Sequence, residues 1–240
     1  MGGRARGPGP RSFELLAWLE RLEVAGLEPL GHAHRLGQRA TYSHVERLAA
    51  AGLVKRIYDR DGSLVAITLD GRRTARPDVF DGRPPRGGLV RGAQSAHARE
   101  VSWVAARLTL RGRAWVSDRE ARTNREWQVP VFLERRGNHR PDLGGFMGTD
   151  RLAIEVELTA KSPSGLRAIL AGYQALLDAG RLAALIYVTD HDGVRRGVER
   201  APARVGLPAD RFRIWSLTDV RAEVQRLARE GRLGRSPSES

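Results

Sequence analysis

Residues 152–159, Leu-Ala-Ile-Glu-Val-Glu-Leu-Thr, constrain the fold of this chain more than any other stretch. Large apolar residues occupy every second position, which is the period of a β-strand, so Glu155 and Glu157 share the opposite face. Two carboxylates two residues apart on one strand face lie roughly 7 Å from each other, and they repel unless a cation or a proton shares the site. Two interpretations follow, a metal-type site in a sheet or a solvated strand face.

A third carboxylate precedes this strand. Asp142 follows the apolar segment 129–133, and the glycine-rich residues 143–148 separate it from the strand. A chain reversal through these glycines would bring Asp142 beside Glu155. Carboxylate oxygens are hard ligands that suit Mg²⁺ or Mn²⁺ held together with several waters. The alternative is a turn aspartate without a ligand.

Lys161 follows the two glutamates, and it is one of only two lysines in the chain. Ser162 is a typical N-cap and Pro163 a typical first helical residue, so Lys161 is expected at a strand-to-helix corner. A cation beside a helix N-terminus opposes the helix dipole. Lys161 therefore needs an anion, which is either Glu157 in a structural ion pair or a phosphate.

Pro141-Asp142, a Glu-x-Glu strand and a lysine before a helix together resemble the PD-(D/E)XK nuclease superfamily. The superfamily pattern is Asp, then Asp/Glu-x-Lys, so Asp142 and Glu155 match its acids while Glu157 stands at the lysine position. Lys161 resembles the shifted lysine of some branches. The resemblance implies catalytic roles for Asp142, Glu155, Glu157 and Lys161. It also implies a bound Mg²⁺ (or Mn²⁺) whose ligands are Asp142, Glu155, the carbonyl of Val156 and, from the preceding helix, Glu100.

The charge balance favours a polyanionic partner. The formal net charge is +13, and nucleic acid is the first expectation for such a surplus. An anionic membrane is the competitor, but the sequence has no basic amphipathic helix with large aromatics and no apolar run as long as a membrane span. There is no cysteine, which excludes disulfides and cysteine-ligated zinc. We expect a cytoplasmic protein without a membrane partner.

Residues 12–75 resemble a winged helix-turn-helix in the order and lengths of their predicted elements. These are helices near 12–22, 29–36 and 39–51, and strands at 53–58 and 64–69 around an Asp-Gly turn. The resemblance implies a third helix in the major groove of DNA and a wing near phosphates. The implied DNA-binding residues are Arg39, Thr41, Tyr42, His44 and Arg47 on the helix, and Lys55, Arg56 and Arg60 on the wing. A winged helix used only for protein contacts is the alternative.

A second domain is predicted after an Arg-, Gly- and Pro-rich linker. Its expected elements are helix 93–110, strands 114–117, 127–133 and 152–159, helix 163–179, strand 182–189, helix 194–205, strand 212–215 and helix 217–230. The order αβββαβ at its start is the core order of the PD-(D/E)XK restriction-endonuclease-like fold, so motif and topology agree. The expected chain is mixed α/β, with a basic arm (1–11), a winged helix-turn-helix (12–75), a linker (76–92), a nuclease-like domain (93–230) and a tail (231–240).

This domain order is similar to that of the replication-relaxation proteins of actinobacterial plasmids and mobile elements, over about residues 12–220. The similarity implies a role in plasmid replication, transfer or DNA topology. Double-stranded DNA is the implied partner, replication or transfer proteins are further candidates, and a homodimer is open. Two functions compete, a metal-dependent DNA nuclease and a non-catalytic DNA-binding adaptor or transcriptional regulator that keeps a degenerate nuclease fold. A partner-binding accessory protein is a third.

Overall fold

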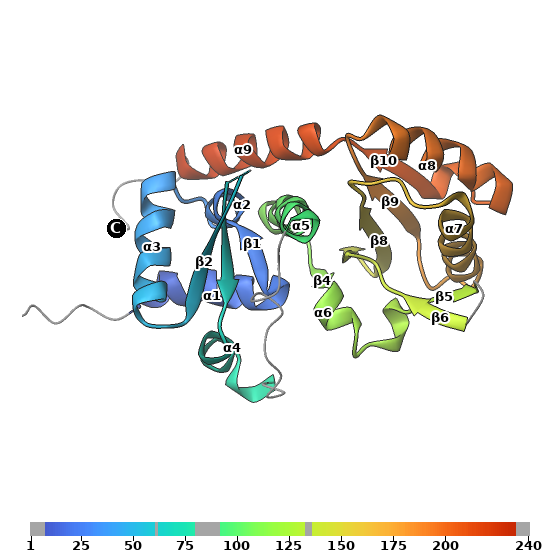
Figure 1. Ribbon diagram of the computed structural model, residues 1–240. Helices are drawn as coiled ribbons and strands as arrows, with labels where there is room; N and C mark the ends of the chain where they lie inside the picture. Colours follow the sequence, from blue (N-terminus) through green and yellow to red (C-terminus); the bar gives the residue numbers. More distant parts are fainter. Residues whose placement is uncertain (1–7, 61, 80–91, 133–135, 234–240) are drawn as a thin grey trace, which may run out of the picture. The chain divides into compact units, whose positions relative to one another are not determined.

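The computed structural model describes residues 8–60, 62–79, 92–132 and 136–233, and it is a mixed α/β protein, as the sequence predicts (Figure 1). The chain divides into two compact units, residues 1–110 with 223–240 and residues 111–222. Most of the expected basic arm, linker and tail lies outside the described residues. None of the helices in the described part is both long and apolar enough to cross a membrane.

The first unit combines helices with a small antiparallel sheet. Its elements are α1 (Pro10–Leu22), β1 (Val24–Gly26), α2 (Leu27–Ala33), α3 (Gln38–Ala50), β2 (Val54–Asp59), β3 (Gly62–Ile67), α4 (Leu69–Ala75), η1 (Pro77–Val79), α5 (Ala93–Leu110) and the end of α9 (Leu217–Leu233). The strand order is β1-β3-β2, with both pairs antiparallel. The expected hairpin is present, and Asp59 pairs with Gly62 across a tight loop. Strand β1 was not predicted, because three residues are too few to reveal an alternation.

Helix α5 was expected to open the second domain, but it belongs to the first unit. Its inner face carries polar groups that bond to other elements of that unit. The Ser102 hydroxyl accepts a hydrogen bond from the Gly26 amide at 3.0 Å, and the Thr109 hydroxyl accepts one from the Trp18 indole at 3.0 Å. Apolar periodicity predicted the helix but not its packing partner. The periodicity shows which face of a helix is buried, but it does not show which other elements pack on that face.

The second unit is built around a five-stranded sheet. Its elements are β4 (Trp115–Ser117), α6 (Asp118–Ala121), η3 (Arg125–Trp127), β5 (Val129–Phe132), β6 (Arg136–His139), β7 (Leu143–Met147), β8 (Asp150–Val156), α7 (Pro163–Asp178), β9 (Ala184–Val188), α8 (Asp192–Val205), η4 (Ala209–Arg211), β10 (Phe212–Trp215) and the start of α9. The strand order is β10-β9-β8-β7-β4. Strands β8, β9 and β10 are parallel, and β7 is antiparallel to β8 and β4.

One strand of the predicted sheet lies elsewhere. The segment 127–133 contains β5, which pairs with β6 in a separate two-stranded sheet. Its place in the main sheet is taken by β7, whose Gly144 and Gly145 read as a turn in the sequence. Gly144 is inside a strand because the Trp127 ring packs directly on its Cα, where a side chain would stand.

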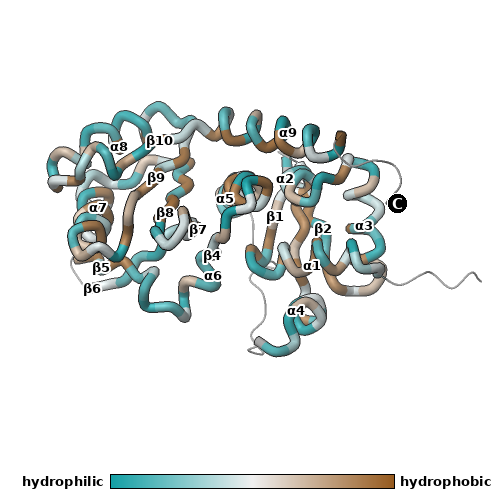
Figure 2. The backbone as a smooth tube through the Cα atoms, turned by 180° about the vertical axis from the view of Figure 1, so that it is seen from behind, coloured by the Kyte–Doolittle hydropathy of each residue, from teal (hydrophilic) through white to brown (hydrophobic). Residues whose placement is uncertain are grey.

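The core of the second unit lies between the sheet and helices α7 and α8. Ala153, Leu185 and Tyr187 of the sheet join Leu170 and Tyr173 of α7 in one buried cluster. Figure 2 shows apolar residues along β9 and polar residues on α8. Helix α7 begins as the sequence predicts, because the Ser162 hydroxyl accepts a hydrogen bond from the Gly165 amide at 3.2 Å and Pro163 is the first residue.

Replacing Gly144 by Ala tests the close packing of Trp127 on β7. A Cβ at residue 144 would collide with the Trp127 ring, so we expect Gly144→Ala to lower the free energy of unfolding by about 1–3 kcal/mol. Gly137→Ala on β6 is the matched control, because a Cβ there meets nothing within 4 Å. Urea unfolding followed by circular dichroism measures both variants, and equal stability of the two would contradict the packing described here.

Candidate functional site

Asp142 directly precedes β7, and Glu155 lies on β8, the strand that pairs with β7. The register pairs Leu143 with Ile154, so Asp142 and Glu155 are the residues that flank this pair at the same end of the β7–β8 ladder. The Asp142 Oδ2 atom accepts a hydrogen bond from the Val156 amide at 2.8 Å. The chain reversal that joins β7 to β8 is at Gly148, which has a φ of 65°. The expected neighbourhood of the two acids is present, although Gly144 and Gly145 are strand residues.

Glu155 is only 3 % exposed, and two protein donors hold one of its oxygens. The Tyr173 hydroxyl of α7 donates to Oε1, and His139 Nε2 lies 2.7 Å from the same atom. Burial and the Glu155 carboxylate raise the pKa of Tyr173 well above its ordinary value. Burial lowers the pKa of His139, but the Glu155 carboxylate outweighs it and leaves that pKa raised. The pair Glu155–His139 therefore favours a protonated imidazole.

Tyr187 stands opposite Glu155 on β9 and completes the buried cluster. Its side chain is fully buried, and its hydroxyl has no hydrogen-bond partner among the described residues. Burial raises the pKa of Tyr187 well above the ordinary value, as do the carboxylates of Glu155 and Asp142. A buried hydroxyl without a partner is unfavourable by itself. It marks a place where the acid cluster has unused hydrogen-bonding capacity.

Lys161 forms an ion pair with Glu157, four residues earlier. Of the two anions considered for this lysine, the structure places the glutamate beside it. The Glu157 side chain is 11 % exposed and that of Lys161 is 32 % exposed, so the cation lies at the surface. Its charge extends to the acid cluster, because Lys161 is among the groups that lower the pKa of His139.

Arg140, between His139 and Asp142, is fixed by an acid that the sequence did not indicate. Its Nε donates to Asp118 Oδ1 at 2.9 Å, and Arg122 donates to Asp118 Oδ2 at 2.7 Å. Burial raises the pKa of Asp118, but the hydrogen bonds from Arg122 and Arg140 outweigh it and leave that pKa lowered. No spacing pattern links residues 118 and 140, because strand pairing rather than sequence distance brings them together.

The donor set fits a hard cation only in part. Within the described residues, no group of three or more His, Cys, Asp or Glu side chains could hold a metal ion. Magnesium, however, is commonly held by one or two carboxylates with waters and phosphate oxygens. Asp142 and Glu155 supply that pair, and the Tyr187 hydroxyl supplies a buried group without a partner. Glu100, the fourth predicted ligand, is buried on α5 of the first unit.

The predicted DNA-binding residues of the first unit fall into two groups. Arg39, Tyr42 and Arg47 of α3 are exposed, as are Lys55 and Arg60 near the hairpin. The other three depart from the expectation, and they are Thr41, His44 and Arg56.

Thr41 is 2 % exposed, and its hydroxyl donates to the Gly37 carbonyl at 3.0 Å. Positions 41, 45 and 48 form the inner stripe of α3, so Thr41 faces the core. His44 is half-buried and lies 2.9 Å from the Ser12 hydroxyl. Burial, together with Arg47 and Arg11, lowers the pKa of His44. A neutral, partnered imidazole is a poor phosphate contact.

Arg56 is enclosed rather than directed at solvent. It donates to the Tyr42 hydroxyl at 2.6 Å and to Glu46 Oε1 at 2.5 Å. Burial lowers its pKa, but these two hydrogen bonds outweigh it and leave that pKa raised. The guanidinium is thus satisfied by the protein, and the expectation of a phosphate contact by Arg56 is not supported by this geometry.

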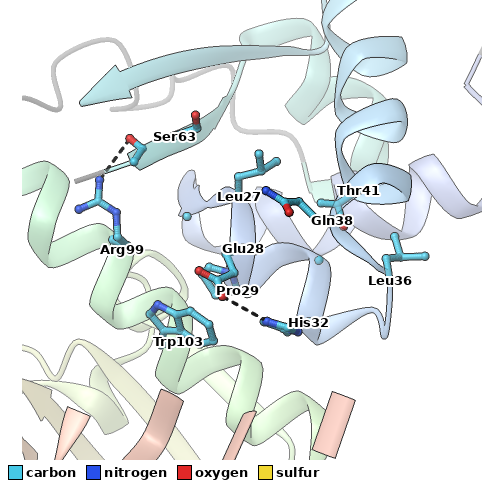
Figure 3. Close-up of a pocket in the computed structure, with 13 residues that line it drawn as sticks. Leu27, Glu28, Pro29, His32, Leu36, Gln38, Thr41, Ser63, Arg99 and Trp103 are labelled. Carbon is cyan, nitrogen blue, oxygen red and sulfur yellow. Dashed lines mark hydrogen bonds and ion pairs between the residues drawn. The ribbon is translucent and has the colours of Figure 1, made fainter. Parts of the chain in front are cut away.

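A cavity of about 500 Å³ lies within the first unit (Figure 3). Its walls come from the end of β1, α2, the start of α3, the start of β3 and α5. His32 lies 3.5 Å from Glu28, its ring is 5.5 Å from that of Trp103, and Arg99 donates to the Gly62 carbonyl at 3.5 Å. Thr41 is the one predicted site residue in its lining. No local motif indicated this cavity, because elements that are far apart in the sequence enclose it.

These features define a two-unit mixed α/β protein with a helical unit and a sheet unit that carries a buried acid cluster. The chain belongs to the replication-relaxation family, whose model matches residues 16–186. None of the curated proteins matches the chain.

Among solved structures, the chain is similar to protein VC1899 from Vibrio cholerae at 13% sequence identity and a TM-score of 0.37. The match covers 94% of this chain and 57% of that one, so this chain spans little more than half of its length.

The two buried tyrosines around Glu155 give a matched test of the cluster. Tyr173 donates to the buried carboxylate, whereas the Tyr187 hydroxyl has no partner in the described structure. We expect Tyr173→Phe to lower the free energy of unfolding by about 1.5–3 kcal/mol, the range for a hydrogen bond to a charged group. Tyr187→Phe should change it by less than about 0.5 kcal/mol or stabilise the protein slightly. Denaturant titration measures both, and similar losses in the two variants would contradict the arrangement.

Proposed function

We propose that this protein binds double-stranded DNA in the replication or transfer of a plasmid or mobile element, and that its second unit is a nuclease-like domain that cleaves phosphodiesters with Mg²⁺. Membership of the replication-relaxation family suggests the replication role. The observation that carries the chemistry is the placement of Asp142, just before β7, beside Glu155 on β8, with the Asp142 carboxylate accepting a hydrogen bond from the Val156 amide. A protein of this function acts in the cytoplasm, where such DNA resides.

The first unit supports the DNA-binding part of the proposal. Three helices and a β2–β3 hairpin follow in the order of a winged helix-turn-helix, and β1 adds a third strand. Helix α3 presents Arg39 and Arg47 to solvent, and Lys55 is exposed on β2. A helix with outward arginines beside a cationic hairpin suits a major groove and its flanking phosphates.

The second unit supports the nuclease-like part. After α5, the antiparallel strands β4, β7 and β8 are followed by α7 and by β9, which is parallel to β8. With α6, η3 and the β5–β6 pair set aside, this order agrees with the αβββαβ order expected of a PD-(D/E)XK core, in which β7 takes the place that the sequence assigned to 127–133. The grouping of α5 with the first unit is the departure from that scheme.

Each residue of the cluster has a part in this proposal. Asp142, Glu155 and the Val156 carbonyl would hold the cation, which when bound would activate water and stabilise negative charge on the phosphate. Tyr173 and His139 fix the orientation of Glu155. Lys161, restrained by Glu157, places a positive charge at the edge of the cluster.

A second function, a non-catalytic DNA-binding adaptor or transcriptional regulator, rests on Glu157. A glutamate stands where the nuclease pattern has lysine, and it already neutralises Lys161. Glu155 also receives two protein donors at one oxygen, which compete with a cation. A domain that has exchanged catalysis for internal hydrogen bonds would keep this fold and bind DNA without cutting it.

Cleavage of supercoiled plasmid in Mg²⁺ or Mn²⁺ separates the two functions. If the domain is a nuclease, we expect Asp142→Asn and Glu155→Gln each to lower the cleavage rate by about 100-fold or more, because each removes a charge that the reaction requires. Asp178→Asn, at an exposed acid in the same unit, is the control that should cut like the wild type. Cleavage by the site variants at the wild-type rate would rule out this site. Silence from all four proteins, with intact DNA binding, would favour the adaptor.

The salt dependence of duplex binding tests helix α3. Replacing Arg39 or Arg47 by Ala should weaken binding to unrelated duplexes alike and reduce the slope of log K against log salt by about 1 per lost phosphate contact. Arg73→Ala, at an exposed arginine on α4 of the same unit, is the matched control. Fluorescence anisotropy at several salt concentrations gives the slopes. Unchanged slopes for Arg39→Ala and Arg47→Ala would remove α3 from the DNA interface.

A further inference from the structure

An arginine lies between two tyrosine rings on the surface of the first unit. The Arg56 guanidinium carbon is 4.3 Å from the centre of the Tyr42 ring and 4.8 Å from the centre of the Tyr58 ring. Tyr42 is on α3 and Tyr58 on β2, two neighbouring elements (Figure 1). Residues 56 and 58 share one face of β2, as strand alternation requires. The three side chains therefore form one stacked cluster that links helix and hairpin.

The Arg56 guanidinium of this cluster bonds to other residues of the protein, whereas its two tyrosines are exposed to solvent. The Arg56 side chain is 12 % exposed, and its NH1 group bonds to both Tyr42 and Glu46. Tyr58 is 70 % exposed and Tyr42 is 45 % exposed. Because Arg56 covers only one face of the Tyr58 ring, the opposite face is available to a partner. Arginine on an aromatic face is an attractive cation–π contact, so it also holds the ring in a fixed orientation.

The surroundings of the rings indicate the chemistry of the partner. Arg39 is one helical turn before Tyr42 on the same face of α3, and Arg60 follows Tyr58 at the hairpin. A flat aromatic surface beside cations matches a nucleic acid whose base faces are accessible, because bases stack on aromatic side chains while the cations meet phosphates. In an intact duplex the base faces are covered by neighbouring bases. The arrangement thus suits unpaired bases better than paired ones.

We infer that Tyr58, with Tyr42 and with Arg56 as the residue that positions both rings, forms a stacking platform for unpaired DNA bases. This inference rests on the proposed DNA binding by the first unit and extends it to single-stranded or locally melted DNA. Arg56 is a positioning residue here, since its own charge is satisfied by Tyr42 and Glu46. Melted DNA is the form that replication and strand transfer both generate.

The test compares three DNA probes on the full-length chain: a fluorescein-labelled dT20 strand, a 20-base-pair duplex and the same duplex with a central unpaired bubble. We expect Tyr58→Ala to weaken binding to dT20 and to the bubble by about 5- to 150-fold, the loss of one stacked base. Binding to the duplex should change less than about twofold. Tyr58→Phe, which keeps the ring, should retain single-strand binding, and Tyr58→Trp should show quenched indole fluorescence when dT20 is added. Because Tyr58 is 70 % exposed, these variants are expected to fold, and thermal unfolding checks this.

Each outcome decides the inference. Selective loss of dT20 and bubble binding in Tyr58→Ala, rescued in Tyr58→Phe, supports the platform. Wild-type binding to duplex without binding to dT20 overturns the platform and leaves the proposed function standing. Equal losses on all three probes also overturn it, because they indicate a general backbone contact. Absence of binding to any probe by the wild type overturns the proposed DNA binding together with the platform.

Discussion

The burial of the Glu155 carboxylate is the constraint around which the second unit is organised. An ionised carboxyl that is 3 % exposed is strongly unfavourable unless donors replace the lost water. The donors come from two directions, the Tyr173 hydroxyl on α7 and the His139 imidazole at the end of β6. Helix α7, the small β5–β6 sheet and the central strand β8 therefore have to meet at one point. The same requirement explains a fully buried tyrosine in a helix that otherwise presents aliphatic residues to the core.

The same cluster links stability to function. The two proposed functions differ in whether the acids beside His139 and Lys161 receive a cation, as in the proposed nuclease, or keep only their protein partners, as in the proposed adaptor. One feature of the structure favours a bound ligand and another favours the adaptor. The Tyr187 hydroxyl lacks a hydrogen-bond partner within the described part of the chain, so a ligand could still satisfy it, whereas Glu157 already pairs with Lys161.

Local sequence patterns located most elements but not their partners. The N-terminal cap of α7 and the β2–β3 hairpin follow from residue identity and spacing, and both are present. Gly144 and Gly145 misled the prediction of the sheet, because glycine signals a turn unless another residue occupies the space of its missing side chain. Trp127 does so here. Helix α5 was placed with the wrong unit for a related reason, since its hydrogen bonds to Gly26 and Trp18 join residues 76 and 91 positions apart.

The sequence by itself determined the mixed α/β class, the family and the neighbourhood of Asp142 and Glu155, because alternation, motif spacing and glycine content are local properties of the chain. Tertiary structure alone decided which groups surround those acids. Strand pairing and helix packing bring four residues to the acids: Tyr173, Tyr187, Asp118 and His139. Contacts of these two kinds join residues at no fixed distance along the sequence, so a local pattern does not predict them. In the first unit, likewise, helical period turned Thr41 inward, and the contact of α3 with β2 enclosed Arg56 between two rings. Whether a charged side chain contacts a phosphate or another residue of the protein depends on its neighbours in space, and the sequence alone does not give those neighbours.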